Sequence, residues 1–164
     1  MISNRITKRN IIHAVILLLL AFNLAFIFVQ SLLPPEKSEQ TSDKVGEIVG
    51  EVIPPETKPG EFLQINLRKI AHFVEFFSLG ALSSIYVVFL GGGIKRAALS
   101  VAFAPTVALL DETLQIASGR NSSVTDVWID SLGFFSAAAI FYTVYILTKI
   151  IIKKVNNSRQ NQAE

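Results

Sequence analysis

Cysteine is absent from the 164-residue chain, which excludes disulfide bonds, thiolate metal ligands and thiol nucleophiles. The sequence also lacks a phosphate-binding loop, an HExxH zinc motif and the residue order of a Ser-His-Asp triad. Charged residues are scarce, at 17%, whereas apolar residues make up 51%. The length allows one compact unit but not two independent domains. The function must therefore be argued from where the few polar residues stand.

The apolar residues form long runs. A helix needs about 20 mostly apolar residues to cross about 30 Å of hydrocarbon. Four segments meet this requirement, namely 11–33, 67–90, 97–117 and 127–148. We therefore predict an all-α polytopic membrane protein, built as a bundle of four transmembrane helices. A water-soluble helical bundle is the alternative, but residues 134–147 have no polar face to present to water.

The first apolar segment is preceded by basic residues, as a secretory signal peptide would be. Its apolar core is longer than that of a typical signal peptide, and no small-x-small cleavage site precedes Pro34-Pro35. We therefore expect residues 11–33 to be a retained helix.

Basic residues are distributed unevenly between the connecting segments. Residues 1–10 and the turn 91–96 carry bases, including Arg5, and no acid, and the tail 149–164 carries four bases against Glu164. Segment 34–66 carries seven acids and three bases. Because bases are enriched in cytoplasmic loops, we predict both termini and 91–96 in the cytoplasm of a bacterial cell. Segments 34–66 and 118–126 are expected on the outer side of the cytoplasmic membrane.

The acidic segment 34–66 is too long for a tight connection and is interrupted by prolines. Between the prolines, Val45, Ile48, Val49 and Val52 recur at helical spacing. This pattern is typical of an amphipathic helix on a membrane surface. A disordered acidic loop is the alternative, since Gly46 and Gly50 weaken a helix.

Polar residues gather in three groups at the expected outer ends of the last three spans. The groups are Arg68, Lys69, His72 and Glu75; Asp111, Glu112 and Gln115; and Arg120, Ser122, Ser123, Asp126 and Asp130. With a rise of about 1.5 Å per residue, Glu75, Asp111 and Asp130 lie about 6 to 10 Å inside the span ends. Carboxylates at that depth must face one another or a water-filled cavity, because lipid would not solvate them.

This expected layer contains five acids against three bases, a formal charge of −2 with His72 neutral. A protonated His72, a protonated carboxyl group, a bound cation or a cationic ligand group would each relieve the excess. We predict His72, Glu75 and Asp111 as candidate acid/base residues. The predicted ligand-binding residues are Arg68, Glu112, Gln115, Arg120, Ser123, Asp126 and Asp130.

Plainer interpretations of these residues stay open. Ser123 stands three residues before Asp126, as in a helix capping box, and Arg68 with Lys69 could serve as interfacial anchors. His72 with Glu75 is weak evidence for zinc, so we predict no metal site or cofactor and keep a divalent cation as an alternative. The entire group could also be a salt-bridge network that holds the bundle together.

Across about residues 10–150 the three motifs together resemble the VanZ-like family of small bacterial membrane proteins. The matching stretches are 68–76 with Leu79-Gly80, 111–115, Gly119-Arg120, 123–127, and Asp130 with Gly133. Family members often have Asn where Asp130 stands. The resemblance implies the membrane topology and the polar cluster. The family is named for a protein associated with teicoplanin resistance in glycopeptide resistance clusters.

Two functions of different class follow as hypotheses. In the first, an outward-facing polar site binds or modifies an envelope amphiphile, such as a lipid, a lipid-linked cell-wall precursor or a lipoglycopeptide, and contributes to glycopeptide resistance. In the second, the protein is a non-enzymatic scaffold subunit of an envelope complex. An ion pathway is less well supported, because the cytoplasmic halves of the last three spans lack ionisable residues. No nucleic-acid partner is expected, and neither a protein partner nor an enzymatic activity is assigned.

Overall fold

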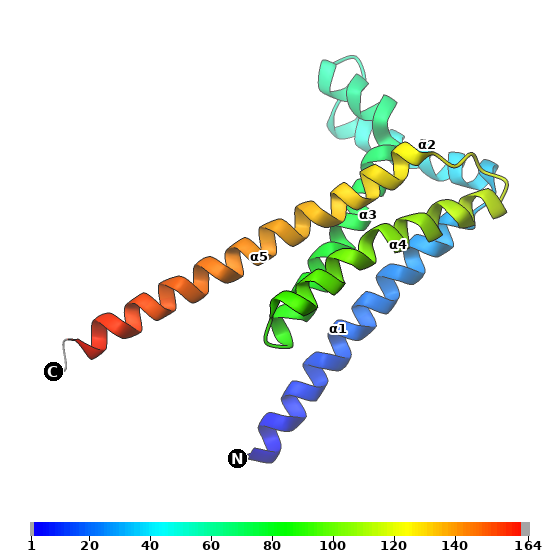
Figure 1. Ribbon diagram of the computed structural model, residues 1–164. Helices are drawn as coiled ribbons and strands as arrows, with labels where there is room; N and C mark the ends of the chain where they lie inside the picture. The colour runs from blue at the N-terminus through cyan, green and yellow to red at the C-terminus, as the bar shows by residue number, and fades with distance from the viewer. Residues whose placement is uncertain (1, 162–164) are drawn as a thin grey trace.

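The computed structural model describes the backbone of residues 2–161 and the side chains of residues 8–161 (Figure 1). The side chain of Arg5 and all of Glu164, which entered the predicted orientation, lie outside this range. Within the described range the chain forms five α-helices and no strand. They are α1 (Ile2–Ser31), α2 (Pro35–Val52), α3 (Lys58–Phe89), α4 (Ile94–Ala117) and α5 (Val124–Gln160).

Helices α1, α3, α4 and α5 are each long and apolar enough to cross a membrane. Their outer faces expose large apolar side chains, including Phe22 (71%), Leu99 (72%) and Trp128 (71%). A water-soluble bundle would bury such side chains, whereas lipid solvates them at no cost. The predicted all-α bundle of four spanning helices is therefore confirmed, and the chain is a multi-pass membrane protein.

All four spanning helices are longer than the apolar segments that predicted them, and α3 and α5 differ most. Helix α3 begins at Lys58 rather than at residue 67, because Thr57 caps its first turn and accepts a hydrogen bond from the Gly60 backbone N–H at 3.2 Å. Helix α5 continues to Gln160 rather than ending at residue 148. Both extensions mix charged and other polar residues with apolar ones, so hydropathy alone places the start of α3 too late and the end of α5 too early.

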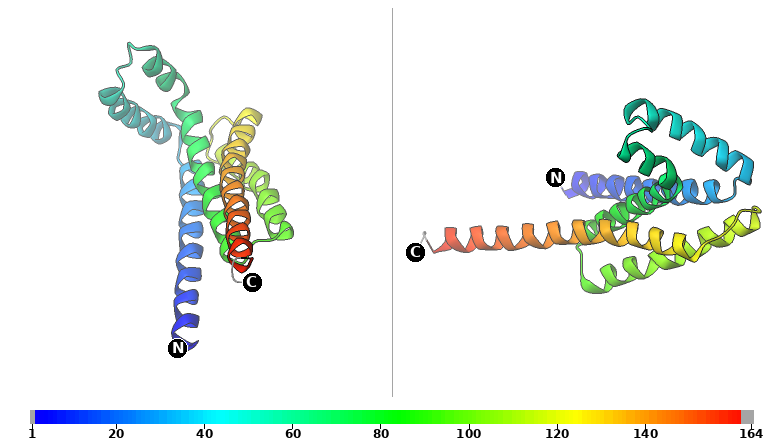
Figure 2. Two further views of the ribbon diagram at one scale, coloured as in Figure 1. Left: turned by 90° about the vertical axis from the view of Figure 1, so that its left-hand side faces the viewer. Right: turned by 90° about the horizontal axis from the view of Figure 1, so that it is seen from above.

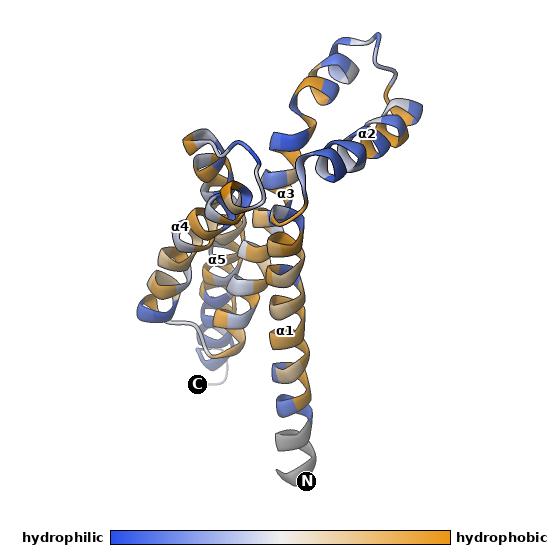
Figure 3. Ribbon diagram, turned by 90° about the vertical axis from the view of Figure 1, so that its right-hand side faces the viewer, coloured by the Kyte–Doolittle hydropathy of each residue, from blue (hydrophilic) through white to orange (hydrophobic). Residues whose placement is uncertain are grey.

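Helix α2 occupies most of the acidic segment 34–66. It starts at Pro35, a residue type suited to the first helical turn, and ends before Pro54. The helix carries both hydrophilic and hydrophobic residues and projects sideways from the bundle (Figures 2 and 3). The Gln64 side chain of α3 donates to the Gly46 carbonyl oxygen of α2 at 2.9 Å. Helices α2 and α3 therefore form a hydrogen-bonded pair at one end of the molecule, which we call the α2 end.

Helices α3 and α5 pack backbone against backbone. A Cβ atom added at Gly80 would lie 2.5 Å from the carbonyl oxygen of Phe134, and one at Gly133 would overlap the carbonyl oxygen of Phe73. Small residues at such positions allow membrane helices to approach closely. The buried core beside this contact comprises Ile27, Phe76, Leu79, Ala104, Val107, Ala108, Phe134 and Ala138.

Helix α1 is joined to α3 by polar contacts as well as by packing. Asn23 donates to the Ser78 hydroxyl at 2.5 Å, and the His13 ring nitrogen lies 2.8 Å from the Tyr86 hydroxyl. Polar bonds of this kind stabilise helix association in lipid, where apolar packing alone gives little preference. They set the position of α1 along α3.

The turn between α3 and α4 consists of Gly91, Gly92 and Gly93, all with positive φ. Only glycine adopts this backbone conformation without strain. The tight turn makes α3 and α4 antiparallel and brings Asp111 of α4 back to the level of His72 of α3. The start of α1 and the end of α5 both point away from the α2 end (Figures 1 and 2).

Candidate functional site

Four ionisable side chains from three helices converge near the α2 end of the bundle. His72 comes from α3, Asp111 and Glu112 from α4, and Asp130 from α5. All four are buried, with exposed fractions of 7%, 1%, 4% and 0% in that order. One potential ligand atom from each lies within 4.8 Å of the others. We call these four residues the carboxylate cluster.

His72 stands between two carboxylates of the cluster. Its Nδ1 atom is 3.1 Å from Asp130 Oδ1 and 3.7 Å from Asp111 Oδ2. The shorter distance is a hydrogen bond, whereas the longer one is a close electrostatic contact. These two are the only ion pairs between side chains of residues 8–161. The imidazole therefore links α3 to both α4 and α5.

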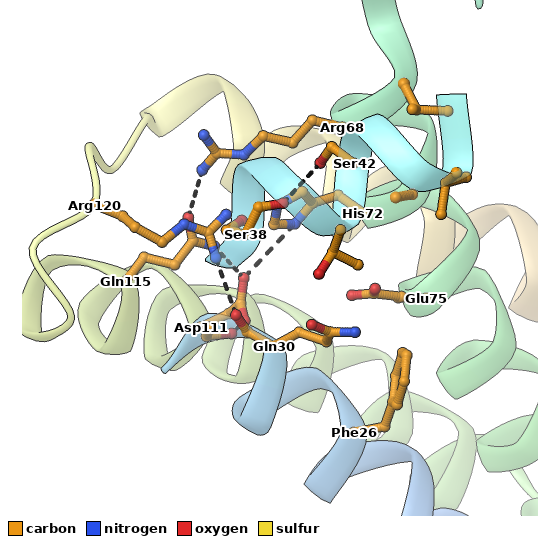
Figure 4. Close-up of a pocket in the computed structure, with 15 residues that line it drawn as sticks. Phe26, Gln30, Ser38, Ser42, Arg68, His72, Glu75, Asp111, Gln115 and Arg120 are labelled. Carbon is orange, nitrogen blue, oxygen red and sulfur yellow. Dashed lines mark hydrogen bonds and ion pairs between the residues drawn. The ribbon is translucent and has the colours of Figure 1, made fainter. Parts of the chain in front are cut away.

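Gln115 connects the cluster to an arginine (Figure 4). Its amide nitrogen donates to Asp111 Oδ2 at 2.8 Å and to Glu112 Oε1 at 3.2 Å. Its amide oxygen accepts a hydrogen bond from Arg68 at 2.7 Å. The amide thus separates a guanidinium from two acids while bonding to all three. An amide can do this at one position because it carries two N–H donors and an acceptor oxygen.

Ser31, at the last turn of α1, was not predicted as a site residue. Its hydroxyl donates to Asp111 Oδ1 and to the Ile27 carbonyl oxygen. The Ser31 carbonyl in turn accepts from the Ser118 hydroxyl at 2.9 Å. A single serine at a helix end has no sequence pattern that marks it, and its role follows only from the packing of α1 against α4.

The two arginines near the cluster bind neutral oxygens rather than acids. Arg68 donates to Gln115, and Arg120 donates to the Gln30 carbonyl oxygen of α1 at 3.0 Å. Burial lowers the pKa of the Arg120 guanidinium, and the positive charge of Arg68 lowers it further. An arginine stays protonated even so, because its ordinary pKa lies far above neutral pH. Within residues 8–161, neither guanidinium is thus bound to a carboxylate, although the two positive charges are near enough to act on one another.

Ser123 caps helix α5, as its sequence position predicts, but with a different acid from the one expected. Its hydroxyl accepts from the Thr125 backbone N–H at 3.2 Å. Its own backbone N–H donates to Glu112 Oε2 at 2.7 Å, the bond that a capping box would assign to Asp126. Glu112 reaches this position because α4 ends beside the start of α5. Asp126 is buried, and no hydrogen bond joins its carboxylate to another side chain in the described part of the chain.

A cavity of about 210 Å³ opens beside the cluster. Its polar wall includes Arg68, His72, Glu75, Asp111 and Arg120, which lie around it in Figure 4. Glu75 stands apart from the hydrogen-bonded network, so the structure does not join it to His72 as a ligand pair. The apolar wall is made by Phe26, Val45, Ala71 and Leu67.

Helix α2 also lines this cavity, through Ser38, Thr41 and Ser42. These three residues were not predicted as site residues from the sequence. A second cavity of about 480 Å³ lies next to the first and shares Ser38, Ser42, Leu67, Arg68 and Arg120 with it. The two arginines therefore line both cavities. Lys69, the base adjacent to Arg68, is exposed and lines neither cavity.

Together, the fold and this site define a class of protein: a multi-pass helical membrane protein with a polar cavity near one end of its bundle. The sequence profile of the VanZ/LLP1 family matches residues 9–149. The chain belongs to this family, as its motifs predict. Comparison with curated proteins and with solved structures found no match.

Proposed function

We propose that the cavity beside Arg68 and Arg120 binds the anionic head group of an envelope amphiphile, on the outer side of the bacterial cytoplasmic membrane. The observation that carries the proposal is the identity of the hydrogen-bond partners of these two arginines. Each donates to a neutral oxygen, and neither is paired with an acid within residues 8–161. Adjacent unpaired guanidinium groups attract a phosphate or carboxylate, which they can bind through paired N–H donors.

The rest of the cavity suits an amphiphile rather than a free anion. Phe26, Val45 and Leu67 give it an apolar wall, and Phe26 is 44% exposed on the outside of α1. An acyl chain leaving the cavity past Phe26 would reach the lipid-facing surface without crossing a polar barrier. The hydroxyls of Ser38 and Ser42 on α2 supply neutral hydrogen-bonding groups for a head group.

The substrate class that fits this arrangement is a phosphate-bearing lipid, either a phospholipid or a lipid-linked cell-wall precursor. The VanZ family's general association with teicoplanin resistance fits such a ligand, because glycopeptides act on cell-wall precursors. A lipoglycopeptide itself is an alternative ligand of the same amphiphilic character. If the ligand is also modified, Glu75 is the acid/base group best placed to reach it, because its side chain lines the cavity outside the hydrogen-bonded network.

The proposal is tested by identifying what copurifies with the intact chain. Wild type, the double variant Arg68→Gln/Arg120→Gln and the matched control Lys69→Gln are purified in mild detergent and compared by native mass spectrometry and lipid extraction. Loss of charged hydrogen bonds at about 1.5–3 kcal/mol each corresponds to at least tenfold weaker binding. We expect one anionic amphiphile at equal occupancy in wild type and control, and at least tenfold less in the double variant. Identical lipid content in all three would contradict the proposal.

The scaffold alternative is distinguished in cells. Deletion of the protein should change glycopeptide susceptibility or the extracted lipids and precursors, and wild type but not the double variant should restore them. A stoichiometric protein partner, with unchanged lipids and susceptibility on deletion, would instead support a scaffold subunit. In that case the hydrogen bonds that tie α1, α3, α4 and α5 at the cluster would have a structural role alone.

A further inference from the structure

The carboxylate cluster carries more buried negative charge than its neighbours neutralise. Asp111, Glu112 and Asp130 are all nearly inaccessible, and burying an unpaired carboxylate is costly. Within residues 8–161, the only positively ionisable group in ion-pair distance of any of them is the single imidazole of His72. One imidazole can offset one of three carboxylates. Arg68 and Arg120 are near but spend their hydrogen bonds on neutral oxygens.

One carboxylate oxygen of the cluster also lacks a bonding partner. Asp130 Oδ2 is fully buried and accepts no hydrogen bond from the described residues 8–161, although Oδ1 of the same group meets His72. Buried polar atoms are nearly always bonded, so an orphan oxygen in a charged cluster calls for an explanation. A positive ion held by the same carboxylate would provide one.

The other two acids are oriented by neutral donors from outside the cluster. Ser31 and Gln115 donate to Asp111, and Gln115 and the Ser123 backbone N–H donate to Glu112. Fixing a carboxylate through its own hydrogen bonds, and leaving its remaining lone pairs directed inward, is how proteins orient metal ligands. His72 likewise orients Asp130, through the contact between its Nδ1 atom and Asp130 Oδ1.

We propose that His72, Asp111, Glu112 and Asp130 bind a divalent transition-metal cation, Mn²⁺ or Zn²⁺. One imidazole nitrogen with three carboxylate oxygens is a mixed set that suits these ions better than Mg²⁺ or Ca²⁺, which prefer oxygen alone. Ligand atoms about 2.1 Å from an ion lie up to about 4.2 Å apart across it. The four atoms already lie within 4.8 Å of one another, so small side-chain movements complete the site. When the cation binds through Nδ1, a protonated imidazole releases the Nδ1 proton to the solvent. A neutral imidazole instead takes the tautomer with its proton on Nε2.

This site differs from the His72 and Glu75 pair that was considered for zinc from the sequence and not predicted as a metal site. That pair joined His72 to Glu75, whereas the structure groups His72 with acids of two other helices. The cation would hold α3, α4 and α5 together beside the cavity. Cation binding does not require the proposed amphiphile, although both proposals use the observation that Arg68 and Arg120 bond to neutral oxygens.

The experiment uses the full chain, purified in detergent and stripped with a chelator, and measures Mn²⁺ and Zn²⁺ binding by calorimetry. We expect one saturable site per chain. Asp111→Asn and Asp130→Asn should each weaken binding at least tenfold, whereas Glu56→Gln, an exposed acid between α2 and α3, should not. Gel filtration confirms that each variant is folded. No saturable binding by the folded wild type would overturn the proposal, as would equal affinities in all variants or an equal loss in Glu56→Gln.

A second readout on wild-type protein covers the case in which a cluster variant fails to fold. Bound Mn²⁺ should show nitrogen hyperfine coupling by pulsed electron paramagnetic resonance. The chain has only two histidines, and His13 lies on α1 bonded to Tyr86. The coupling should persist in His13→Gln. Its absence in wild type, or its loss in His13→Gln, would contradict ligation by His72.

Discussion

Nδ1 of His72 lies 3.1 Å from Oδ1 of Asp130, although the two residues are 58 positions apart in the chain. This contact joins helices α3 and α5 close to a point where their backbones also meet, because Gly133 of α5 packs against Phe73, the residue after His72. The buried polar contact and the apolar packing therefore act on the same pair of helices. Substitutions that disrupt either contact should lower the stability of the purified protein.

Replacing Asp130 by Asn should preserve the contact with His72, because an amide oxygen also accepts a hydrogen bond from Nδ1–H. We expect the chelator-stripped Asp130→Asn variant to unfold thermally at nearly the wild-type temperature. Asp130→Leu leaves the buried imidazole without this partner and should cost about 1–3 kcal/mol. Thermal unfolding in detergent measures both. Equal stability of the Leu and Asn variants would show that the bond to Asp130 contributes nothing.

Replacing Gln115 by Glu should be more damaging than its similar shape suggests. A carboxylate cannot donate to Asp111 and Glu112, and it adds another negative charge beside them. We expect Gln115→Glu to lower stability by several kcal/mol, because it leaves buried acids unpaired and repelling one another. Gln115→Met, which removes the bonds without adding charge, is the matched control and should be the milder change. Wild-type stability in the Glu variant would refute the bonding pattern of Gln115.

The α3–α5 contact should not tolerate a side chain at Gly80. A methyl group there would lie 2.5 Å from the Phe134 carbonyl oxygen, and backbone cannot yield as a flexible side chain does. Overpacking of this kind typically costs about 1–3 kcal/mol. Gly50→Ala on α2, where the nearest atom would be an ordinary 3.7 Å away, is the control. Gly80→Ala should therefore reduce the yield and the unfolding temperature, and Gly50→Ala should not; equal behaviour of the two would contradict the close packing.

Much of the fold follows from the sequence, because runs of about 20 apolar residues can be satisfied only by spanning helices. The meeting of His72, Asp111 and Asp130 also follows in outline, since connected antiparallel spans return to the same level and each residue adds a fixed rise. The extra turns of α3 before residue 67 did not follow, because they depend on the Thr57 cap and on the contact between Gln64 and Gly46.

Details of the site depend on contacts between helices that periodicity does not encode. By helical spacing, Glu75 shares a face of α3 with Arg68 and His72. Spacing does not reveal which residue of another helix a side chain meets. In the structure, Glu75 lines the cavity outside the cluster. Ser31 is an unremarkable serine until α1 packs beside Asp111. The bond of Arg120 is to a backbone oxygen of Gln30, which no side-chain pattern can reveal.

The natural absence of cysteine permits a direct test of whether the α2 end, with its polar cavity, faces outward. Single substitutions are made at two exposed positions, Glu39→Cys on α2 and Lys95→Cys at the start of α4, and intact cells are treated with a membrane-impermeant maleimide. The outward orientation predicts labelling at position 39 in intact cells, and at position 95 only after the membrane is permeabilised. Labelling of position 95 in intact cells while position 39 stays protected would contradict it, because the cavity would then open to the cytoplasm.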